Sequence, residues 1–276
     1  MTAFLPSFFF LLSACAPKEA LPDAPQPSTK KEESIEIPNP MAPPPPKRDE
    51  NVWQVDDVDI SAVREDYKHI AFTFDDAPGK TLEQLVSVFL SYNKENPDAP
   101  ASATVFCNGA YLNDYTRAPL QAAYTAGFEL GNHTYSHKNL TALTQEELAW
   151  EIERNDEILS EIDGKRLHLL RAPYGKIDER VKTNAKTPIM DWYIDTLDWQ
   201  EKNAEEIYQT VFSQKSDGAI VLMHDGYDST VDALKRLLPD LKAAGYQILS
   251  VSQMAKFHRC PLRVGGVYTR ARKKTS

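Results

Sequence analysis

The sequence has few cysteines, no surplus of positive charge and, near its N-terminus, no apolar run long enough to span a membrane. Its 276 residues contain three cysteines, Cys15, Cys107 and Cys260, too few for a disulfide-based scaffold. Lysine and arginine number 31 against 40 aspartates and glutamates, and the resulting net charge of −9 opposes nucleic acid as a partner. The apolar stretch at residues 8–12 is too short for a membrane-spanning helix. What remains is a chain of globular composition, long enough for one large domain or two small ones.

The first fifteen residues resemble an export signal. The apolar stretch ends in Leu12-Ser13-Ala14-Cys15, which is similar to the bacterial lipobox, in which the cysteine carries the lipid. No lysine or arginine precedes the stretch, so the usual positive segment is missing, and a plain hydrophobic N-terminus is the alternative. We therefore expect an exported protein of the cell envelope that meets the membrane only through a lipid on Cys15. In that compartment Cys107 and Cys260 could pair, but two buried thiols explain them equally well.

Residues 16–50 predict a disordered linker. They hold ten of the nineteen prolines, mixed with lysine, glutamate and serine. Such a segment buries too little apolar surface to offset its ordering entropy, and its proline runs favour extended spacing. It would hold the globular part away from a membrane.

From residue 69 onward, short apolar runs alternate with segments of helical period, which predicts a parallel sheet built from βα units. Seven strands, a barrel-like number, are expected at residues 69–74, 103–106, 128–131, 167–170, 189–194, 218–223 and 246–250. Helices are expected at residues 80–92, 145–162, 204–214 and 230–244. Thr144 and Glu147 form a capping box before the second helix, and Gly245 ends the last.

Ionisable side chains follow five of these strands. They are Asp75 and Asp76, then His133 and His137, then Arg171, then Asp195, and finally His224. Because βα barrels gather their active sites at the carboxyl ends of the strands, we expect these groups to share one cleft.

His133 and His137 are spaced to bind one metal ion, since i and i+4 lie above one another on a helix. Asp76 would supply a third ligand. Two histidines and one carboxylate leave positions open for water and substrate, as catalytic sites require. The same three ligands alone would also suit a non-heme iron oxygenase. The charged residues beside them argue against that alternative.

Those neighbours predict acid and base roles. Asp75 is free to take a proton from a metal-bound water, with Arg171 holding it ionised; a salt bridge at the barrel rim is the structural alternative for Arg171. His224 ends an apolar run and could be a core histidine, but a nearby carboxylate, for which we expect Asp195, would raise its pKa and make it an acid. Together these residues predict a metal-assisted hydrolase.

At this point the chain resembles the polysaccharide deacetylases of the NodB-homology type, carbohydrate esterase family 4, most closely those acting on peptidoglycan N-acetylglucosamine. Five motifs occur in the family's order, at residues 73–76, 133–137, 171–174, 195–199 and 222–224. The resemblance implies that Asp75 is the base, that His224 is the acid tuned by Asp195, and that Asp76, His133 and His137 bind metal. It also implies that the Tyr174 backbone N–H helps hold the oxyanion, and that Leu222 and Trp199 wall the acetyl methyl pocket.

The implied fold is α/β, a distorted, incomplete (β/α) barrel. The implied cofactor is a divalent metal, Zn²⁺ first, with Co²⁺ or Ni²⁺ as alternatives. The family usually has glycine where Ala77 stands, so a turn needing positive φ would be strained there. Relatives acting on N-acetylmuramic acid often carry asparagine at the position of Asp76, which favours N-acetylglucosamine here.

We therefore expect a monomeric enzyme that removes N-acetyl groups from N-acetylglucosamine in a cell-wall glycan such as peptidoglycan or chitin. An acetyl-xylan-type O-deacetylase and a catalytically silent glycan-binding lipoprotein are the alternatives. The expected organisation is a signal at 1–15, a linker at 16–50, an N-terminal extension at 51–66, a catalytic domain at 67–258 and a C-terminal tail at 259–276.

Overall fold

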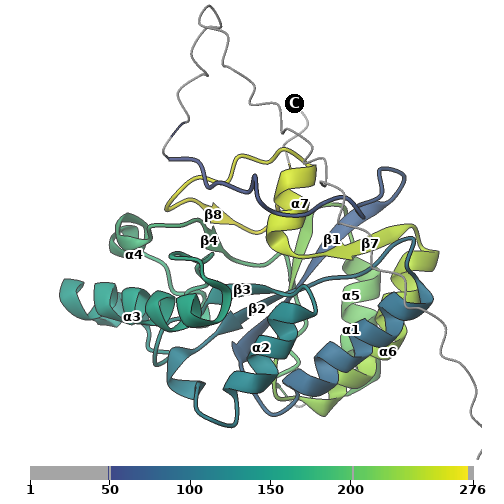
Figure 1. Cartoon of the computed structure of the whole chain (residues 1–276), viewed down its shortest axis with the longest axis horizontal. Coiled ribbons are helices and arrows are strands. Elements are labelled where there is room, and N and C mark those ends of the chain that lie inside the picture. The colour runs from purple at the N-terminus through teal and green to yellow at the C-terminus, as the bar shows by residue number, and fades with distance from the viewer. Residues whose placement is uncertain (1–48, 50, 201, 273–276) are drawn as a thin grey trace, which may run out of the picture. The chain divides into compact units, whose positions relative to one another are not determined.

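The computed structural model describes residues 49, 51–200 and 202–272 (Figure 1). Cys15 and the expected signal lie outside the described residues, as does the expected linker apart from residue 49. None of the helices in the described part is long and apolar enough to span a bilayer. Cys107 and Cys260 are separate thiols, the first buried and the second half-buried.

A parallel sheet of six strands is built around β1 (Lys68–Ala77), in the order β3-β2-β1-β6-β5, with β7 pairing beside the first part of β1. The other strands are β2 (Thr104–Cys107), β3 (Glu129–Asn132), β5 (Ile194–Asp195), β6 (Ala219–His224) and β7 (Tyr246–Leu249). The register between β1 and β6 sets Asp75 directly beside His224. Asp75 and His224, which we expected in one cleft, therefore lie next to each other at the carboxyl ends of these two strands.

Single bridges continue this sheet toward a barrel. Leu170 joins Asn132 at the end of β3 to Ile189 in β4 (Ile189–Met190), and β4 pairs with β8 (Val267–Tyr268). Beyond β8, Arg270 bridges back to Ala219 in β6. Because isolated bridges stand where full strands would close the ring, the barrel is distorted and incomplete, as predicted.

Seven α-helices are found in the described part: α1 (Leu82–Glu95), α2 (Arg117–Thr125), α3 (Gln145–Asp163), α4 (Glu179–Asn184), α5 (Ala204–Gln214), α6 (Asp228–Ala243) and α7 (Val251–Phe257). Helix α6 packs against both α1 and α5 (Figure 1). The predicted capping box is present at the start of α3, where Thr144 and Glu147 exchange hydrogen bonds. The main core lies between these helices and the sheet, with Ile70, Phe72 and Phe74 of β1 fully buried in it.

Two expected strands differ from the structure. Residues 167–170 contribute only the bridge at Leu170, because the His168 ring hydrogen-bonds to Asp156 of α3 and to Asp163, which ties this segment to that helix. The strand expected at 189–194 divides into β4 and β5, because the chain changes partner there. Asp191 donates its N–H to Tyr268 beside β4, whereas Tyr193 donates to Ile220 of β6. The C-terminal segment expected as a tail supplies β8.

Candidate active site

Asp75 lies buried at the carboxyl end of β1, only 4% exposed. Its Oδ1 accepts a hydrogen bond from Arg171 Nη1 at 2.8 Å, and Arg171 is itself completely buried rather than at a rim. The guanidinium also donates to Thr73 Oγ1 and to the Met190 carbonyl, so its position is fixed. Burial alone would raise the pKa of Asp75, but the charge of Arg171 and its hydrogen bond, together with the neighbouring His133 and His224, outweigh burial and the pKa is lowered. Asp75 is therefore an ionised carboxylate able to accept a proton.

The neighbouring Asp76 faces two imidazoles. Its Oδ1 lies 3.5 Å from His137 Nε2 and 3.8 Å from His133 Nε2, and the three ligand atoms lie within 4.8 Å of one another. This oxygen is buried and has no hydrogen-bond partner. Since buried polar atoms are seldom left unpaired, an orphaned carboxylate oxygen facing two imidazole nitrogens fits a divalent cation.

The two histidines lie on a loop after β3, not on a helix. Left-handed backbone at Thr134 (φ 68°) and His137 (φ 58°) turns the loop, and Asn132 Oδ1 supports it by accepting the Thr134 N–H at 2.8 Å. The His133 ring donates from Nδ1 to the Arg171 carbonyl at 2.8 Å, which leaves the Nε2 lone pair facing Asp76. The i, i+4 spacing would stack the two rings only on a helix; here the loop brings the ligands together instead.

His224, at the end of β6, is paired with Asp198. Its Nδ1 lies 2.7 Å from Asp198 Oδ1, and the second oxygen of Asp198 accepts the His224 N–H at 2.8 Å and the Thr230 hydroxyl at 2.7 Å. Burial lowers the pKa of His224, but the hydrogen bond to Asp198 and nearby carboxylates outweigh it, so the pKa is raised. The site thus sets an ionised carboxylate beside a histidine that favours its protonated form.

Comparisons with known protein families, sequences and structures agree with this geometry. Residues 62–189 match the family model described as polysaccharide deacetylase. A peptidoglycan-N-acetylglucosamine deacetylase of Bacillus cereus is 32% identical over 208 residues, which cover 69% of this chain and 89% of that protein. The chain belongs to the polysaccharide deacetylase family.

A second relative in the family is the peptidoglycan-N-acetylmuramic acid deacetylase PdaC of Bacillus subtilis, 33% identical over 188 residues. The match covers 68% of this chain, and the chain spans 38% of the length of PdaC. The solved structure of PdaC superimposes with a TM-score of 0.65 at 32% identity, covering 71% of this chain and 94% of the structure. The resemblance drawn from the five motifs is therefore confirmed at the level of family and fold.

Within the family's fourth motif, the assignment of Asp195 is wrong. Asp195 Oδ1 accepts the backbone N–H of Leu197 at 2.9 Å and so stabilises the turn after β5, in which Leu197 has a φ of 54°. That turn brings Asp198 back against His224. Both carboxylates stand in the same motif, but Asp195 lies at the end of the strand and Asp198 follows the turn. The spacing did not reveal the turn that makes the second one the partner.

A further residue missed by the sequence reasoning is Asp225, which follows His224. It is 4% exposed, and its carboxylate accepts the N–H of Gly79 at 2.5 Å as well as the N–H and hydroxyl of Thr81. Asp225 therefore fixes the loop that leaves the two catalytic-site carboxylates. Ala77 fits this loop without strain, because the left-handed residue is Asp76 (φ 62°) rather than Ala77.

The remaining motif residues lie near the metal ligands or the acid strand. Tyr174 has left-handed backbone (φ 61°), and its ring lies edge-on to His137 with centroids 4.7 Å apart. Leu222 is buried in β6, two residues before His224, and Trp199 is half-exposed beside Asp198. Their roles in an acetyl pocket and an oxyanion site stay predictions.

Proposed function

We propose that this chain is a metal-dependent hydrolase that removes N-acetyl groups from N-acetylglucosamine in a cell-wall polysaccharide. One observation carries the proposal: the unpartnered Asp76 Oδ1 faces His133 and His137, with Asp75 and His224 side by side next to it. The names of relatives support the substrate class, among them a chitin deacetylase of Arthroderma benhamiae.

The metal side of the reaction would use the three ligands and Asp75. Asp76, His133 and His137 would hold a divalent ion, proposed as Zn²⁺ with Co²⁺ or Ni²⁺ as alternatives, which would polarise the acetyl carbonyl and acidify water. Asp75, held ionised by Arg171, takes the proton of the attacking water. The Tyr174 backbone N–H is the proposed donor to the oxygen of the tetrahedral centre.

The acid side would use His224. Protonated and held by Asp198, it gives its proton to the glucosamine nitrogen as the carbon–nitrogen bond breaks, which releases acetate and a free amine. Leu222 and Trp199 would contact the acetyl methyl group. Since this machinery serves an ester as well as an amide, the substrate and not the site separates the N-deacetylase from the acetyl-xylan-type enzyme.

We further propose that the protein acts as an exported monomer in the cell envelope, with Cys15 as the lipid attachment site. The sequence around Cys15 and the proline-rich linker support this placement. The cell-wall substrates named for the family relatives agree with it.

Acetate release from the purified protein tests the proposal. Peptidoglycan, chitooligosaccharides and acetylated xylan are supplied with and without a chelator, and we expect chelator-sensitive acetate chiefly from the two amide substrates. Mass spectrometry of the digested peptidoglycan shows which sugar has lost its acetyl group. Preference for xylan would indicate the ester enzyme. Glycan binding without turnover, equal in the wild type and Asp75→Asn, would indicate a silent binding protein.

A further inference from the structure

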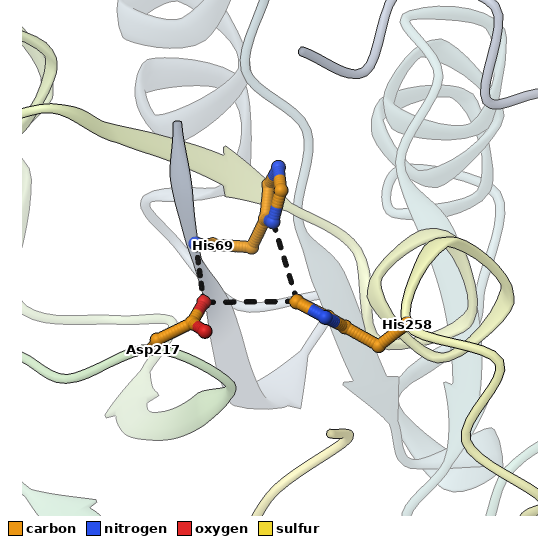
Figure 2. Close-up of side chains that lie close together, drawn as sticks. All are labelled: His69, Asp217 and His258. Carbon is orange, nitrogen blue, oxygen red and sulfur yellow. Dashed lines mark hydrogen bonds and ion pairs between the residues drawn. The ribbon is translucent and has the colours of Figure 1, made fainter. Parts of the chain in front are cut away.

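A second group of metal-ligand side chains lies at the other end of β1 (Figure 2). His69 stands near the start of β1, Asp217 directly before Gly218 at the entry to β6, and His258 directly after α7. His69 and Asp75 are six positions apart along extended strand, a span of about 20 Å. This group is therefore separate from the active site.

The distances in this group match those of the catalytic ligands. His69 Nδ1 lies 3.2 Å from His258 Nε2, and His258 Nε2 lies 3.7 Å from Asp217 Oδ1. All three ligand atoms lie within 4.8 Å of one another, as they do in the catalytic set. Ligand atoms around a tetrahedral zinc ion stand about 3.3 Å apart. Small movements would therefore suffice to bring these atoms to coordination distance.

Neighbouring groups already orient the three ligands. The Arg64 carbonyl lies 3.0 Å from His69 Nε2 and can only accept, so the proton is on Nε2 and the Nδ1 lone pair faces His258. The Phe257 ring packs against the His69 ring with centroids 4.5 Å apart. Burial also lowers the pKa of both imidazoles, which keeps them in the neutral form that binds metal.

Access and charge are also compatible with an ion. His69 is buried, whereas the side chains of His258 and Asp217 are 15% and 22% exposed, so water can reach a fourth position. Arg272 Nη1 lies 3.3 Å from Asp217 Oδ2, which orients the carboxylate and leaves Oδ1 toward the histidines. The same positive charge opposes a cation, so the affinity should be lower than at the active site.

We propose that His69, Asp217 and His258 form a second site for a borderline divalent metal ion such as Zn²⁺, which clasps the end of α7 to the starts of β1 and β6. The group lies at the amino-terminal ends of barrel strands, opposite the end where barrels carry their chemistry, so the proposed role is structural. The proposal does not depend on the deacetylase activity.

Zinc binding by four forms of the full chain tests it: the wild type, His137→Ala, His258→Gln and the double variant. Glutamine at 258 keeps an N–H donor for His69 Nδ1 but removes the imidazole ligand. Each protein is dialysed against Zn²⁺ and its bound metal measured, with circular dichroism as the folding control. We expect two zinc ions in the wild type, one in each single variant and none in the double variant.

Thermal unfolding of His137→Ala tests the second site without changing any of its three proposed ligands. Zinc should raise the melting temperature of His137→Ala, because an ion bound only by the folded state stabilises it, and should not raise that of the double variant. The proposal is overturned if folded His137→Ala binds no zinc, or if the double variant keeps one zinc ion. Absence of deacetylase activity in the wild type, with zinc still held by His137→Ala, would contradict the proposed function alone.

Discussion

The two ends of β1 carry the same ligand types but differ in what their carboxylates already contact. At the catalytic end, Asp76 Oδ1 is buried without a partner. At the other end, Asp217 Oδ1 accepts the His69 N–H at 2.9 Å, and Oδ2 lies 3.3 Å from Arg272. An unsatisfied group that folding alone would not retain marks the place where function requires a ligand. A carboxylate that already has such contacts gains less from a cation, which agrees with the lower metal affinity expected at the second site.

The largest expected effect lies at the catalytic end. Asp75→Asn keeps the shape of the side chain and an acceptor for Arg171 but removes the proton acceptor. We expect kcat for acetate release to fall by about 10³-fold, within the range for loss of a general base. Asp217→Asn is the matched control at the opposite end, and its kcat should stay near that of the wild type. Equal losses in the two variants would mean that Asp75 acts through stability and not through proton transfer.

A smaller effect separates the two carboxylates of the fourth motif. Asp198→Asn should lower kcat by roughly 10²-fold, because His224 loses the charge that favours its protonated form. Asp195→Asn should leave His224 unaffected, since Asp195 contacts the Leu197 N–H. Steady-state kinetics on chitooligosaccharides measure both, and a larger loss for Asp195→Asn would reverse the assignment made from the structure.

The pH dependence of kcat also distinguishes Asp198 from Asp195, because only loss of Asp198 should shift it. The acid form of His224 is required, and its pKa is raised above 6.5, so the rate should fall on the alkaline side as pH rises through that raised value. In Asp198→Asn the raising contact is gone, and the alkaline limb should move to lower pH. In Asp195→Asn the limb should not move.

How far the sequence predicts the site depends on whether a residue acts from a strand or from a turn. Asp75, Arg171 and His224 were predictable, because apolar runs locate strand ends and barrel geometry brings those ends together. Asp198 was not, since its position depends on a left-handed turn that no periodicity encodes. The group at His69 was not predictable either, because its partners Asp217 and His258 are distant in sequence and meet it only in the fold.

His168 is also a histidine among carboxylates, but its contacts favour binding a proton rather than a metal ion. Burial lowers the pKa of its imidazole, but hydrogen bonds to Asp156 and Asp163 outweigh it and raise the pKa to about 8. Since the folded-state pKa exceeds the unfolded value, this stabilisation is complete below about pH 6.5 and is lost as pH rises through about 8. The difference in unfolding free energy between the wild type and His168→Gln should shrink by about 2 kcal/mol between pH 6 and pH 9. A pH-independent difference in chemical denaturation would contradict an imidazolium here.

The smallest expected effect is on stability, and its sign should differ between the two ends of β1. In metal-free protein, Asp76→Asn removes a buried, unpartnered carboxylate oxygen beside Asp75, and asparagine tolerates the left-handed backbone at this position. We expect the free energy of unfolding to rise by about 1 kcal/mol. Asp217→Asn instead weakens contacts to His69 and Arg272 and should lower it by a similar amount, about 1 kcal/mol. Urea denaturation with a chelator present measures both, and destabilisation by Asp76→Asn would show that its carboxylate is satisfied without a metal.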